Sequence, residues 1–368
     1  MKVLQAVHHF HPCVGGMERV VLDSCRALMK AGHACKVVCL NKCAKAEACL
    51  PPTENVQGVA VTRVPFLDLN YYKVAPRILE AAKGVDLVHV HGLGFFSDWF
   101  LLTKFLHRKP VVVSTHGGIF HTRKLGLLKA FYFQVVQRVL LGFADAVLAV
   151  SKNDLETFRQ VCPRTVLVEN AIDSGKFSNV IPGSKTNLLF VGRIARNKRI
   201  DRLLETVWLL KNDVPGLKLF IVGDDFDGLT PALQKRTHEL NLDRNVEFCG
   251  SATDKELKAY FAKCGLFVSA SEYEGFGLSV LEAMSAGLIP AVQRNEAFRH
   301  TVRPGANGFL VDYGKAELAA EQLHEILGLP AKRLAALGLE ARKTAQAYSW
   351  EKRVKELEAV YRQAMGLI

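Results

Sequence analysis

Two glutamates that flank a glycine-rich turn are the residues of this sequence best suited to hold a polar ligand. Glu274 and Glu282 lie eight residues apart in the stretch SEYEGFGLSVLEAMSAG. The apolar run after the turn has helical spacing, so the residues between the two acids present backbone N–H groups where a helix is predicted to begin. These residues are Gly275, Phe276, Gly277 and Leu278.

The predicted helix start is suited to a phosphate, because its unpaired N–H groups and the positive end of the helix dipole attract an anion. Glu274 and Glu282 can then accept hydrogen bonds from hydroxyl groups on either side of that phosphate. The pattern indicates a ligand with a polyol at each end, such as a sugar joined through a diphosphate to a ribose. Simple complementarity with the helix dipole is the alternative, and it accounts for Glu274 but leaves the glycines unexplained.

A second predicted loop carries two basic side chains suited to the same ligand. The stretch FVGRIARNKRID follows a predicted strand that ends at Gly192, and it places Arg193 and Lys198 five residues apart. A guanidinium and an ammonium that converge from one loop neutralise a diphosphate well. Arg196 and Arg199 are expected to face solvent.

Three predicted strands in the first half of the chain are also followed by polar or glycine residues. Gly15 and Gly16 open a helix, where an anion can approach, although a Gly-Gly pair alone is usually an ordinary turn. His116, in STHGG, is placed to hydrogen-bond a ligand hydroxyl or to hold a proton, with a structural histidine as the alternative. Ser151 either touches the ligand or caps the next helix.

The elements that must position these residues alternate between strand and helix in both halves of the chain. A length of 368 residues and a hydrophobic content of 49% fit two globular domains. Strands rich in Val and Leu predict an α/β fold of two doubly wound, Rossmann-like domains. The predicted strands are 2–7, 35–40, 59–64, 85–91, 110–116, 146–151, 187–193, 217–224, 246–251, 265–271, 288–293 and 308–312.

The domain boundary is predicted where this rhythm is interrupted. Residues 170–187 contain Gly, Pro, Ser and Asn without periodicity, which indicates a linker. We expect an N-terminal domain over residues 1–172 and a C-terminal domain over residues 185–349, with a ligand cleft at the carboxyl ends of their strands. The last segment, 350–368, predicts an amphipathic helix.

Missing patterns argue against several classes of protein. No G-x-G-x-x-G motif follows a strand and no phosphate-loop motif is present, which disfavours a dinucleotide oxidoreductase and a P-loop ATPase. No window reaches the roughly 18 apolar residues of a membrane span, and the first residues lack a signal-peptide cleavage site. A cytoplasmic protein is therefore expected.

No metal site is predicted. The nine cysteines, six of them before residue 50, lack the spacing of zinc ligands, so we interpret them as free thiols in a reducing compartment. His8, His9 and His11 would point to alternating faces at a strand end, without a carboxylate close in sequence. The acidic stretch GDDFDG at 223–228 is expected to form a polar turn.

The net charge of +12 is unevenly distributed, since no acidic residue lies between Asp98 and Asp145. A basic surface with interleaved aromatic groups suits an anionic membrane or a phosphate-bearing partner. An ordinary solvated face is the main alternative, and nucleic acid is not the expected partner. The basic residues are Lys104, Arg108, Lys109, Arg123, Lys124, Lys129 and Arg138, and the aromatic ones are Trp99, Phe100, Phe105, Phe120, Phe131, Tyr132 and Phe133.

These motifs together resemble those of glycosyltransferase family 4 (group 1), whose members are retaining enzymes with the GT-B fold. The stretch that holds Glu274 and Glu282 is similar to the family's Glu-x7-Glu motif, and the resemblance covers nearly the whole chain. It includes the Gly15-Gly16 turn, THGG with His116, the Val-Ser pair ending at Ser151, NAID at 170–173, GR followed by Lys198, and SW before the last helix.

The resemblance implies two Rossmann-like domains that face a central cleft, with the C-terminal helix (350–368) crossing back to the first domain. The second domain would bind a nucleoside-diphosphate sugar and the first would bind the acceptor, without a metal or another cofactor. Arg193 and Lys198 would hold the diphosphate, Glu282 the ribose and Glu274 the sugar hydroxyls. His116 would lie near the reacting carbon. The other implied donor-binding positions are Gly15, Gly16, Ser151, Gly275, Phe276, Gly277 and Leu278.

The implied reaction is transfer of a hexose with retention of anomeric configuration. We expect mannose from GDP-mannose, with UDP-sugars next, and a glycan acceptor linked to polyprenyl diphosphate in cell-surface polysaccharide synthesis. The protein would work peripherally at the cytoplasmic face of the membrane. A sugar epimerase or phosphorylase of the same fold and a non-catalytic nucleotide-sugar binding protein are the alternatives.

Retention through a covalent intermediate needs a carboxylate beside the anomeric carbon. Glu274 is better explained as a hydroxyl ligand than as that nucleophile. Our hypothesis is therefore front-face transfer, in which the leaving phosphate accepts the proton of the acceptor.

Overall fold

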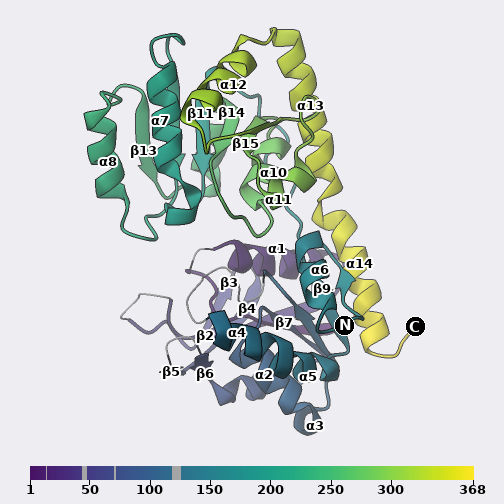
Figure 1. The fold of residues 1–368 in the computed structure, drawn as a ribbon. Helices are drawn as coiled ribbons and strands as arrows, with labels where there is room; N and C mark the ends of the chain where they lie inside the picture. Colours follow the sequence, from purple (N-terminus) through teal and green to yellow (C-terminus); the bar gives the residue numbers. More distant parts are fainter. Residues whose placement is uncertain (14, 44–47, 70–71, 118–125) are drawn as a thin grey trace. The chain divides into compact units, whose positions relative to one another are not determined.

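The structure is a computed structural model that describes residues 1–13, 15–43, 48–69, 72–117 and 126–368. The chain divides into two compact units (Figure 1). Unit 1 comprises Met1–Ala171 and Trp350–Ile368, and unit 2 comprises Ile172–Ser349. Each unit has its own mainly parallel sheet with helices on both faces, which confirms the predicted α/β class.

Unit 1 contains an eight-stranded sheet in the order β10-β9-β8-β7-β1-β2-β4-β3. Its strands pair in parallel except at the edge, where β3 and β4 are antiparallel. A separate antiparallel pair, β5–β6, lies outside this sheet. The strands are β1 (Lys2–Ala6), β2 (Ala34–Leu40), β3 (Thr53–Val56), β4 (Val59–Val64), β5 (Leu67–Leu69), β6 (Tyr72–Val74), β7 (Leu87–His91), β8 (Val111–Ser114), β9 (Ala146–Ala149) and β10 (Val166–Leu167).

The alternation of side chains along each strand divides the core of unit 1 into two layers. Leu4 and Val88 pack on the face covered by α2, whereas Val37 and Val61 pack on the face covered by α1. The helices are α1 (Gly16–Lys30), η1 (Pro76–Ala82), α2 (Phe95–Leu102), α3 (Lys104–His107), α4 (Gly126–Phe131), η2 (Tyr132–Gln137), α5 (Arg138–Leu140), η3 (Leu141–Phe143), α6 (Lys152–Arg159) and α14 (Trp350–Ala364).

The last helix, α14, belongs to unit 1 although the whole of unit 2 precedes it in the chain. Trp350, Val354, Leu357 and Tyr361 form its buried face, at the spacing of one side of a helix. The helix packs beside α1, and Tyr361 Oη lies 2.7 Å from Nδ1 of His89 in β7. The C-terminal helix therefore returns to the first unit, as predicted.

Unit 2 contains a six-stranded parallel sheet in the order β13-β12-β11-β14-β15-β16. Helices α7, α8 and α12 cover the face that carries Leu188, and α9, α10, α11 and α13 cover the face that carries Leu189. The strands are β11 (Ser184–Val191), β12 (Lys218–Val222), β13 (Val246–Gly250), β14 (Cys264–Ser269), β15 (Ile289–Gln293) and β16 (Phe309–Val311). The helices are η4 (Arg196–Lys198), α7 (Ile200–Leu210), α8 (Thr230–Glu239), α9 (Asp254–Lys263), α10 (Leu278–Ser285), α11 (Glu296–Thr301), α12 (Ala316–Gly328) and α13 (Ala331–Ala347).

Each parallel sheet has one point at which the direction of winding reverses. In unit 1, β1 has β7 on one side and β2 on the other, and in unit 2, β11 lies between β12 and β14. The connections on the two sides of such a point leave over opposite faces, so a crevice opens at the carboxyl ends of the strands, where doubly wound folds bind ligands. In unit 2 this point is bordered by residues 192–199 after β11 and residues 270–277 after β14.

All twelve predicted strands are present, and in most of them the apolar and β-branched residues are buried in the two sheets. Four short strands are missed by the sequence analysis: β3, β5, β6 and β10. Three residues of β3 and all of β5 are exposed, so these strands have no buried apolar pattern that a sequence could reveal.

The predicted linker over 170–187 is wrong. Phe177 and Val180 are buried in the core of unit 2, and the N–H of Ile172 donates to the carbonyl of Tyr348 at 2.9 Å. Strand β11 already begins at Ser184. The glycine, proline and serine residues of this segment form turns that pack against unit 2. Because turns and free linkers have similar composition, the sequence does not distinguish them.

The prediction of free cysteines is also corrected, because Cys13 and Cys43 form a disulfide. Cys13 follows β1 and Cys43 follows β2, and these strands are parallel neighbours, so the residues beyond their carboxyl ends meet. The two Cα atoms are 5.4 Å apart despite a sequence separation of 30. The free cysteines are Cys25, Cys35, Cys39, Cys49, Cys162, Cys249 and Cys264.

Gly223 allows the chain after β12 to approach the end of β11 closely. It has φ of +149°, and a Cβ at this position would lie 1.9 Å from the carbonyl oxygen of Gly192. We expect Gly223→Ala to lower the free energy of unfolding by about 2–4 kcal/mol, since the backbone must shift or strain. Urea unfolding followed by circular dichroism measures the loss. Gly328→Ala is the control, because its Cβ would meet no atom within 4 Å; equal midpoints for both variants would contradict the argument.

Candidate functional site

Two loops of unit 2 meet at the carboxyl ends of β11 and β14. The N–H of Glu272 donates to the carbonyl of Asn197 at 2.9 Å. The side-chain amide of Asn197 in turn donates to the carbonyl of Tyr273 at 3.1 Å. These bonds hold residues 192–199 beside residues 270–277, so the two loops that the sequence analysis assigned to one ligand are neighbours.

An ion pair joins the same two loops. Lys198 Nζ lies 2.6 Å from Oε1 of Glu274, and the two side chains are only 15% and 14% exposed. A pair this well covered is screened less than one on the surface. A diphosphate would offer Lys198 a more highly charged partner, and the carboxylate of Glu274 would then be available to accept from hydroxyl groups.

Arg193 extends from the first loop and is supported by an aromatic ring. Its Cζ lies 4.5 Å from the centroid of the Phe226 ring, which is a cation–π contact. The N–H of Phe226 donates to the carbonyl of Ile194 at 3.0 Å, so the ring is attached to the loop that carries the arginine. The contact orients a guanidinium that is otherwise exposed.

The other two arginines of this loop differ from each other. Arg196 is exposed, in agreement with the sequence analysis. Arg199 is not turned to solvent as predicted, because its guanidinium forms ion pairs with Asp201 at 2.7 Å and with Glu272 at 2.5 Å. One of these partners, Glu272, is 73 residues away from Arg199 in sequence, so this ion pair forms only in the folded chain.

Helix α10 begins directly after the glycine-rich turn. Gly277 has φ of +90°, and a Cβ there would lie 3.0 Å from the ring of Phe298, so glycine is required on both counts. The first N–H groups of a helix have no acceptor within the helix and can serve a ligand. Gly275 and Phe276 precede this start, Leu278 is its first residue, and Glu282 is half-buried within the helix.

The predicted residues of unit 1 lie after the carboxyl ends of β1, β8 and β9. Gly16 is the first residue of α1, and Gly15 is its N-cap with an extended backbone. Ser151 is the N-cap of α6, where its Oγ accepts from the N–H of Asp154 at 3.2 Å. The structure therefore gives the Ser151 hydroxyl a capping role, which is one of the two alternatives raised from the sequence.

His116 follows β8 and is fixed from both sides. Its φ of +46° is uncommon for a residue other than glycine, and such a conformation persists where the surroundings enforce it. Asp154 accepts from Thr115 Oγ1 at 2.5 Å and from the N–H of Gly117 at 2.9 Å, which secures both neighbours of the histidine. The His116 ring contacts His91, whose Nδ1 lies 2.8 Å from Nε2 of His116.

A buried polar chain continues behind His91, and the sequence analysis did not identify it. It consists of Gln5 in β1, His89 and His91 in β7, Ser114 at the end of β8 and Tyr361 in α14. The signal was present in the sequence, since VHVH puts two imidazoles on one face of a central strand, where a buried polar group needs partners.

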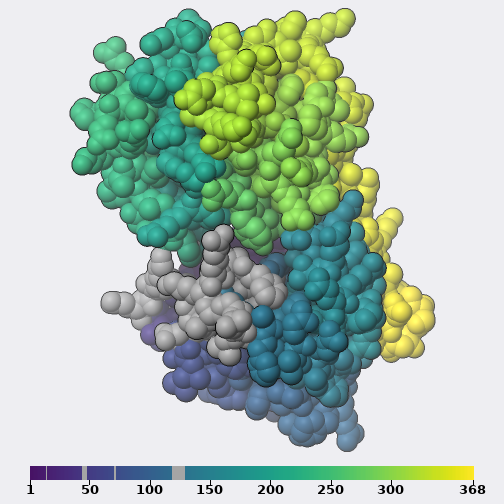
Figure 2. Space-filling model, in the orientation of Figure 1, coloured from purple at the N-terminus to yellow at the C-terminus, as the bar shows by residue number. Residues whose placement is uncertain are grey.

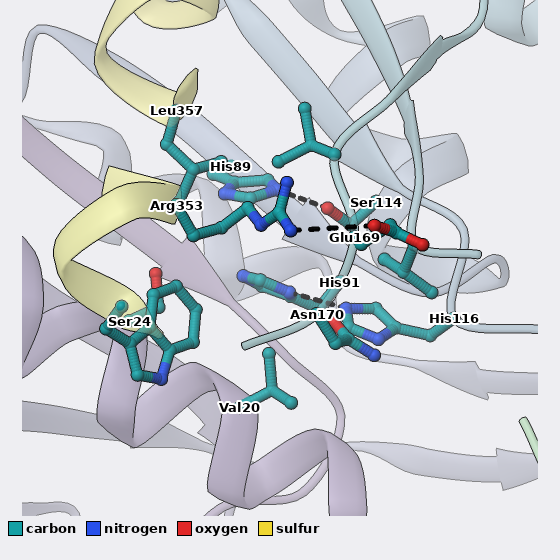
Figure 3. Close-up of a pocket in the computed structure, with 13 residues that line it drawn as sticks. Val20, Ser24, His89, His91, Ser114, His116, Glu169, Asn170, Arg353 and Leu357 are labelled. Atoms are coloured by element: carbon teal, nitrogen blue, oxygen red, sulfur yellow. Dashed lines mark hydrogen bonds and ion pairs between the residues drawn. The ribbon is translucent and has the colours of Figure 1, made fainter. Parts of the chain in front are cut away.

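Figure 3 shows these histidines around a small cavity of unit 1. The cavity has a volume of about 20 Å³, which is enough for roughly one water molecule. Arg353 of α14 reaches over it toward Glu169, with 3.6 Å between the guanidinium and the carboxylate.

Burial keeps the three histidines of this cluster neutral at pH 7. Loss of solvation lowers the pKa of His89 to about 3 and the pKa of His116 to about 4. Burial also holds the pKa of His91 well below its usual value, and the neighbouring His89 and His116 lower it further.

No group of three or more His, Cys, Asp and Glu in the described ranges could hold a metal ion. The acidic residues of the stretch 223–228 accept hydrogen bonds from backbone N–H groups, both within the turn and from the loop after β11. Asp225 accepts from the N–H groups of Leu229 and Thr230 at 2.8 and 2.9 Å. Asp227 accepts from the N–H of Arg196 at 2.9 Å.

A larger cavity of about 430 Å³ lies in unit 2 against α7 and α8. Arg196, Arg199 and Arg236 line it, but none of the predicted donor-binding residues does. We therefore place the candidate site at the Lys198–Glu274 pair and the start of α10.

The chain matches two family models. The model described as Glycosyltransferase Family 4 covers residues 14–176, and the model described as Glycosyl transferases group 1 covers residues 172–344. Their junction coincides with the division between Ala171 and Ile172 that separates the two units.

Known proteins match over the full length. A GDP-mannose:cellobiosyl-diphosphopolyprenol alpha-mannosyltransferase from Xanthomonas oryzae pv. oryzae is 34% identical, over 100% of this chain and 98% of its own. A protein of the same name from Komagataeibacter xylinus is 29% identical, over 100% of this chain and 94% of its own.

Solved structures share the fold. Sucrose-phosphate synthase from Thermosynechococcus elongatus has a TM-score of 0.81 at 22% identity, covering 100% of both chains. Anabaena HepE in complex with UDP and glucose has a TM-score of 0.77 at 19% identity, covering 98% of both chains.

We expect Lys198→Ala to weaken the binding of GDP and UDP about tenfold or more, because a charge-assisted hydrogen bond contributes about 1.5–3 kcal/mol. Glu282→Ala should weaken it as well, through loss of a ribose contact. Isothermal titration calorimetry measures both effects. Arg196→Ala is the matched control from the same loop and should bind normally. Wild-type affinity in Lys198→Ala would show that the diphosphate is held elsewhere.

Proposed function

Because the chain belongs to glycosyltransferase family 4, we propose that it transfers mannose from GDP-mannose to a glycan carried on polyprenyl diphosphate. The chain is a glycosyltransferase with the GT-B fold, that is, with two Rossmann-like domains. We propose the donor and the acceptor from the names of the relatives. The similarity to these relatives extends over both units, and thus over the domains predicted to bind the donor and the acceptor.

The observation that carries the site assignment is the ion pair between Lys198 and Glu274 beside the start of α10. It supports the assignment because an ammonium, which suits a diphosphate, and a carboxylate, which suits sugar hydroxyls, lie together at the switch point of the sheet in unit 2. Arg193 comes from the same loop as Lys198. We assign the diphosphate to these two cations and to the N–H groups of α10, the sugar hydroxyls to Glu274, and the ribose to Glu282.

The proposed catalysis is mainly electrostatic. The bond between the anomeric carbon and the phosphate oxygen breaks, and negative charge builds on the leaving diphosphate. Lys198, Arg193 and the start of α10 stabilise that charge with groups already in place. The acceptor oxygen attacks from the same face, and its proton passes to an oxygen of the leaving phosphate.

The front-face route follows from the role proposed for Glu274. Its carboxylate accepts from hydroxyl groups of the donor sugar once the diphosphate has taken Lys198 as its partner. A carboxylate held by those hydrogen bonds is better suited to orient the sugar than to form a glycosyl-enzyme intermediate.

Transfer assays with GDP-mannose, UDP-glucose and ADP-glucose on lipid extracts and on cellobiosyl-diphosphopolyprenol test the proposal. We expect mannose transfer from GDP-mannose and an α-linked product, which NMR of the purified glycolipid identifies. A β-linked product would contradict retention, and a covalent adduct trapped on Glu274 would contradict the front-face route. Turnover with UDP-glucose alone would move the donor assignment to uridine nucleotides.

A lipid-linked acceptor requires access to a membrane, and unit 1 has a face suited to it. Phe131, Val135 and Val139 are 59%, 49% and 59% exposed and recur every four residues along α4, η2 and α5. Phe105, in α3, is 72% exposed. The blue area of Figure 2 includes this part of the chain. We define the apolar face as Leu102, Phe105, Leu106, Phe131, Val135, Val139 and Phe143.

Basic residues accompany the apolar face, which fits an anionic lipid surface. Arg108 and Arg138 are exposed, and Lys104 and Lys129 belong to the same helices as the apolar residues. Arg123, Lys124 and Phe120, which the sequence analysis also assigned to this region, lie outside the described residues. In the part of the chain that the structure describes, none of the helices is long and apolar enough to span a bilayer.

We expect the protein to bind vesicles that contain phosphatidylglycerol, and to release them as salt screens the basic residues. The double variant Val135→Asp with Val139→Asp should lose this binding, because it places two carboxylates in the apolar face. Co-sedimentation measures the bound fraction. Leu339→Asp is the control, since Leu339 is 55% exposed but lies in α13 of unit 2. Equal binding by both variants, or none by the wild type at low salt, would contradict the membrane assignment.

A further inference from the structure

The buried polar chain of unit 1 has a direction, and that direction decides which ring nitrogen of His116 carries the proton. Two hydrogen bonds define the end of the chain that reaches His116. His91 Nδ1 lies 2.8 Å from His116 Nε2, and His91 Nε2 lies 2.6 Å from Gln5 Oε1. Figure 3 shows the His91 and His116 rings beside each other, joined by the first of these bonds.

Gln5 sets the direction. Its side-chain oxygen can only accept, so the nitrogen of His91 that faces it must carry a proton. Reversing the amide would place two nitrogens 2.6 Å apart, which is shorter than a normal hydrogen bond between them. The amide nitrogen of Gln5 faces Tyr361 Oη instead, at 3.5 Å.

A neutral imidazole carries one N–H, so His91 with its proton on Nε2 has a lone pair on Nδ1. That lone pair faces Nε2 of His116, which must therefore be the donor. The low pKa values that burial gives to both rings support the neutral state on which this step depends. His116 is left with its own lone pair on Nδ1.

The second branch of the chain is consistent with the same direction. Tyr361 accepts from Gln5 and donates to Nδ1 of His89, at 2.7 Å. His89 then carries its proton on Nε2 and donates to Ser114 Oγ, also at 2.7 Å. In this direction His91, Gln5, Tyr361 and His89 each donate to an acceptor, as expected in a buried network.

We propose that His91 is a positioning residue that, with Gln5 behind it, fixes His116 in the Nε2–H tautomer, so that Nδ1 of His116 accepts a hydrogen bond from a hydroxyl of the sugar substrate. This rests on the proposed function, and on the position near the reacting carbon that the resemblance to family 4 implies for His116. No described residue bonds to Nδ1 of His116. The backbone is fixed by Asp154 through Thr115 and Gly117, so ring and backbone are both preset.

A neutral acceptor suits this position. A glycosyl transition state has oxocarbenium character, so positive charge develops at the anomeric carbon. An imidazolium close to that carbon would oppose the charge, whereas a lone pair that accepts from a hydroxyl orients the sugar without doing so.

Gln5→Glu tests the direction with a side chain of the same length. The carboxylate that this variant introduces stabilises His91 as an imidazolium, which donates through Nδ1. The Nε2 atom of His116 must then accept, so the proton of His116 moves to its own Nδ1. Long-range ¹H–¹⁵N spectra of histidine-labelled protein distinguish the tautomers, with His116→Asn to assign the signal. We expect the Nε2–H form of His116 in the wild type and the Nδ1–H form in Gln5→Glu.

The kinetic expectation is a fall in kcat/KM of about tenfold or more in Gln5→Glu, with unchanged GDP affinity, because the lone pair toward the sugar is lost. Ser114→Ala is the control: it removes the acceptor of His89 in the same core and should leave the His116 tautomer and turnover unchanged. His91→Phe serves as a second variant, and we expect mixed tautomers of His116 and reduced turnover.

The Nδ1–H form of His116 in the wild type overturns the proposal, as does full activity in a Gln5→Glu variant whose tautomer has switched. A wild-type protein that transfers no sugar but shows the Nε2–H form would count against the proposed function and leave the direction of the chain established.

Discussion

The position of β11 within its sheet is the constraint on which the proposed donor site depends. Because β12 and β14 lie on opposite sides of β11, the chain leaves β11 and β14 over opposite faces of the sheet, and the loops at their carboxyl ends border one crevice. Residues far apart in sequence are thereby brought together: Asn197 bonds to the backbone beside Tyr273, and Lys198 pairs with Glu274. The glycines at 223 and 277 serve this arrangement, since each allows a close approach that a side chain would block.

The proposed binding groups of the two units differ in charge. Unit 2 collects charges, an ammonium and a guanidinium near a helix start, which suit the anionic end of a donor and the charge that grows on it. Unit 1 places neutral groups around His116, and the alternation of side chains in β1, β7 and β8 puts them on the face covered by α1 and α14. A neutral imidazole presents either an N–H or a lone pair to a ligand, so in unit 1 the order of hydrogen-bond donors and acceptors determines what the ligand meets, as net charge does in unit 2.

The sequence predicts the features of this protein that depend on local pattern. The twelve core strands follow from runs of apolar and β-branched residues, and the loops that hold Lys198 and Glu274 follow from their place after such runs. Features that depend on pairing across the fold are missed. The disulfide between Cys13 and Cys43 exists because β1 and β2 are neighbours, and Arg199 is paired by Glu272 from another loop. The packed segment around Phe177 has the composition of a linker, and only its burial distinguishes the two.

The return of α14 to unit 1 affects the order in which the protein can fold during synthesis. Residues 1–171 leave the ribosome first, yet Trp350, Leu357 and Tyr361 are needed to close their core and to satisfy His89. Unit 2, which is continuous from Ile172 to Ser349, has to be made in the meantime. At about 5–20 residues per second this takes roughly 10–35 s. For that interval the α14-binding face of the nascent sheet, including a buried imidazole pair, has no cover from its own chain, which makes it a natural point of attachment for chaperones.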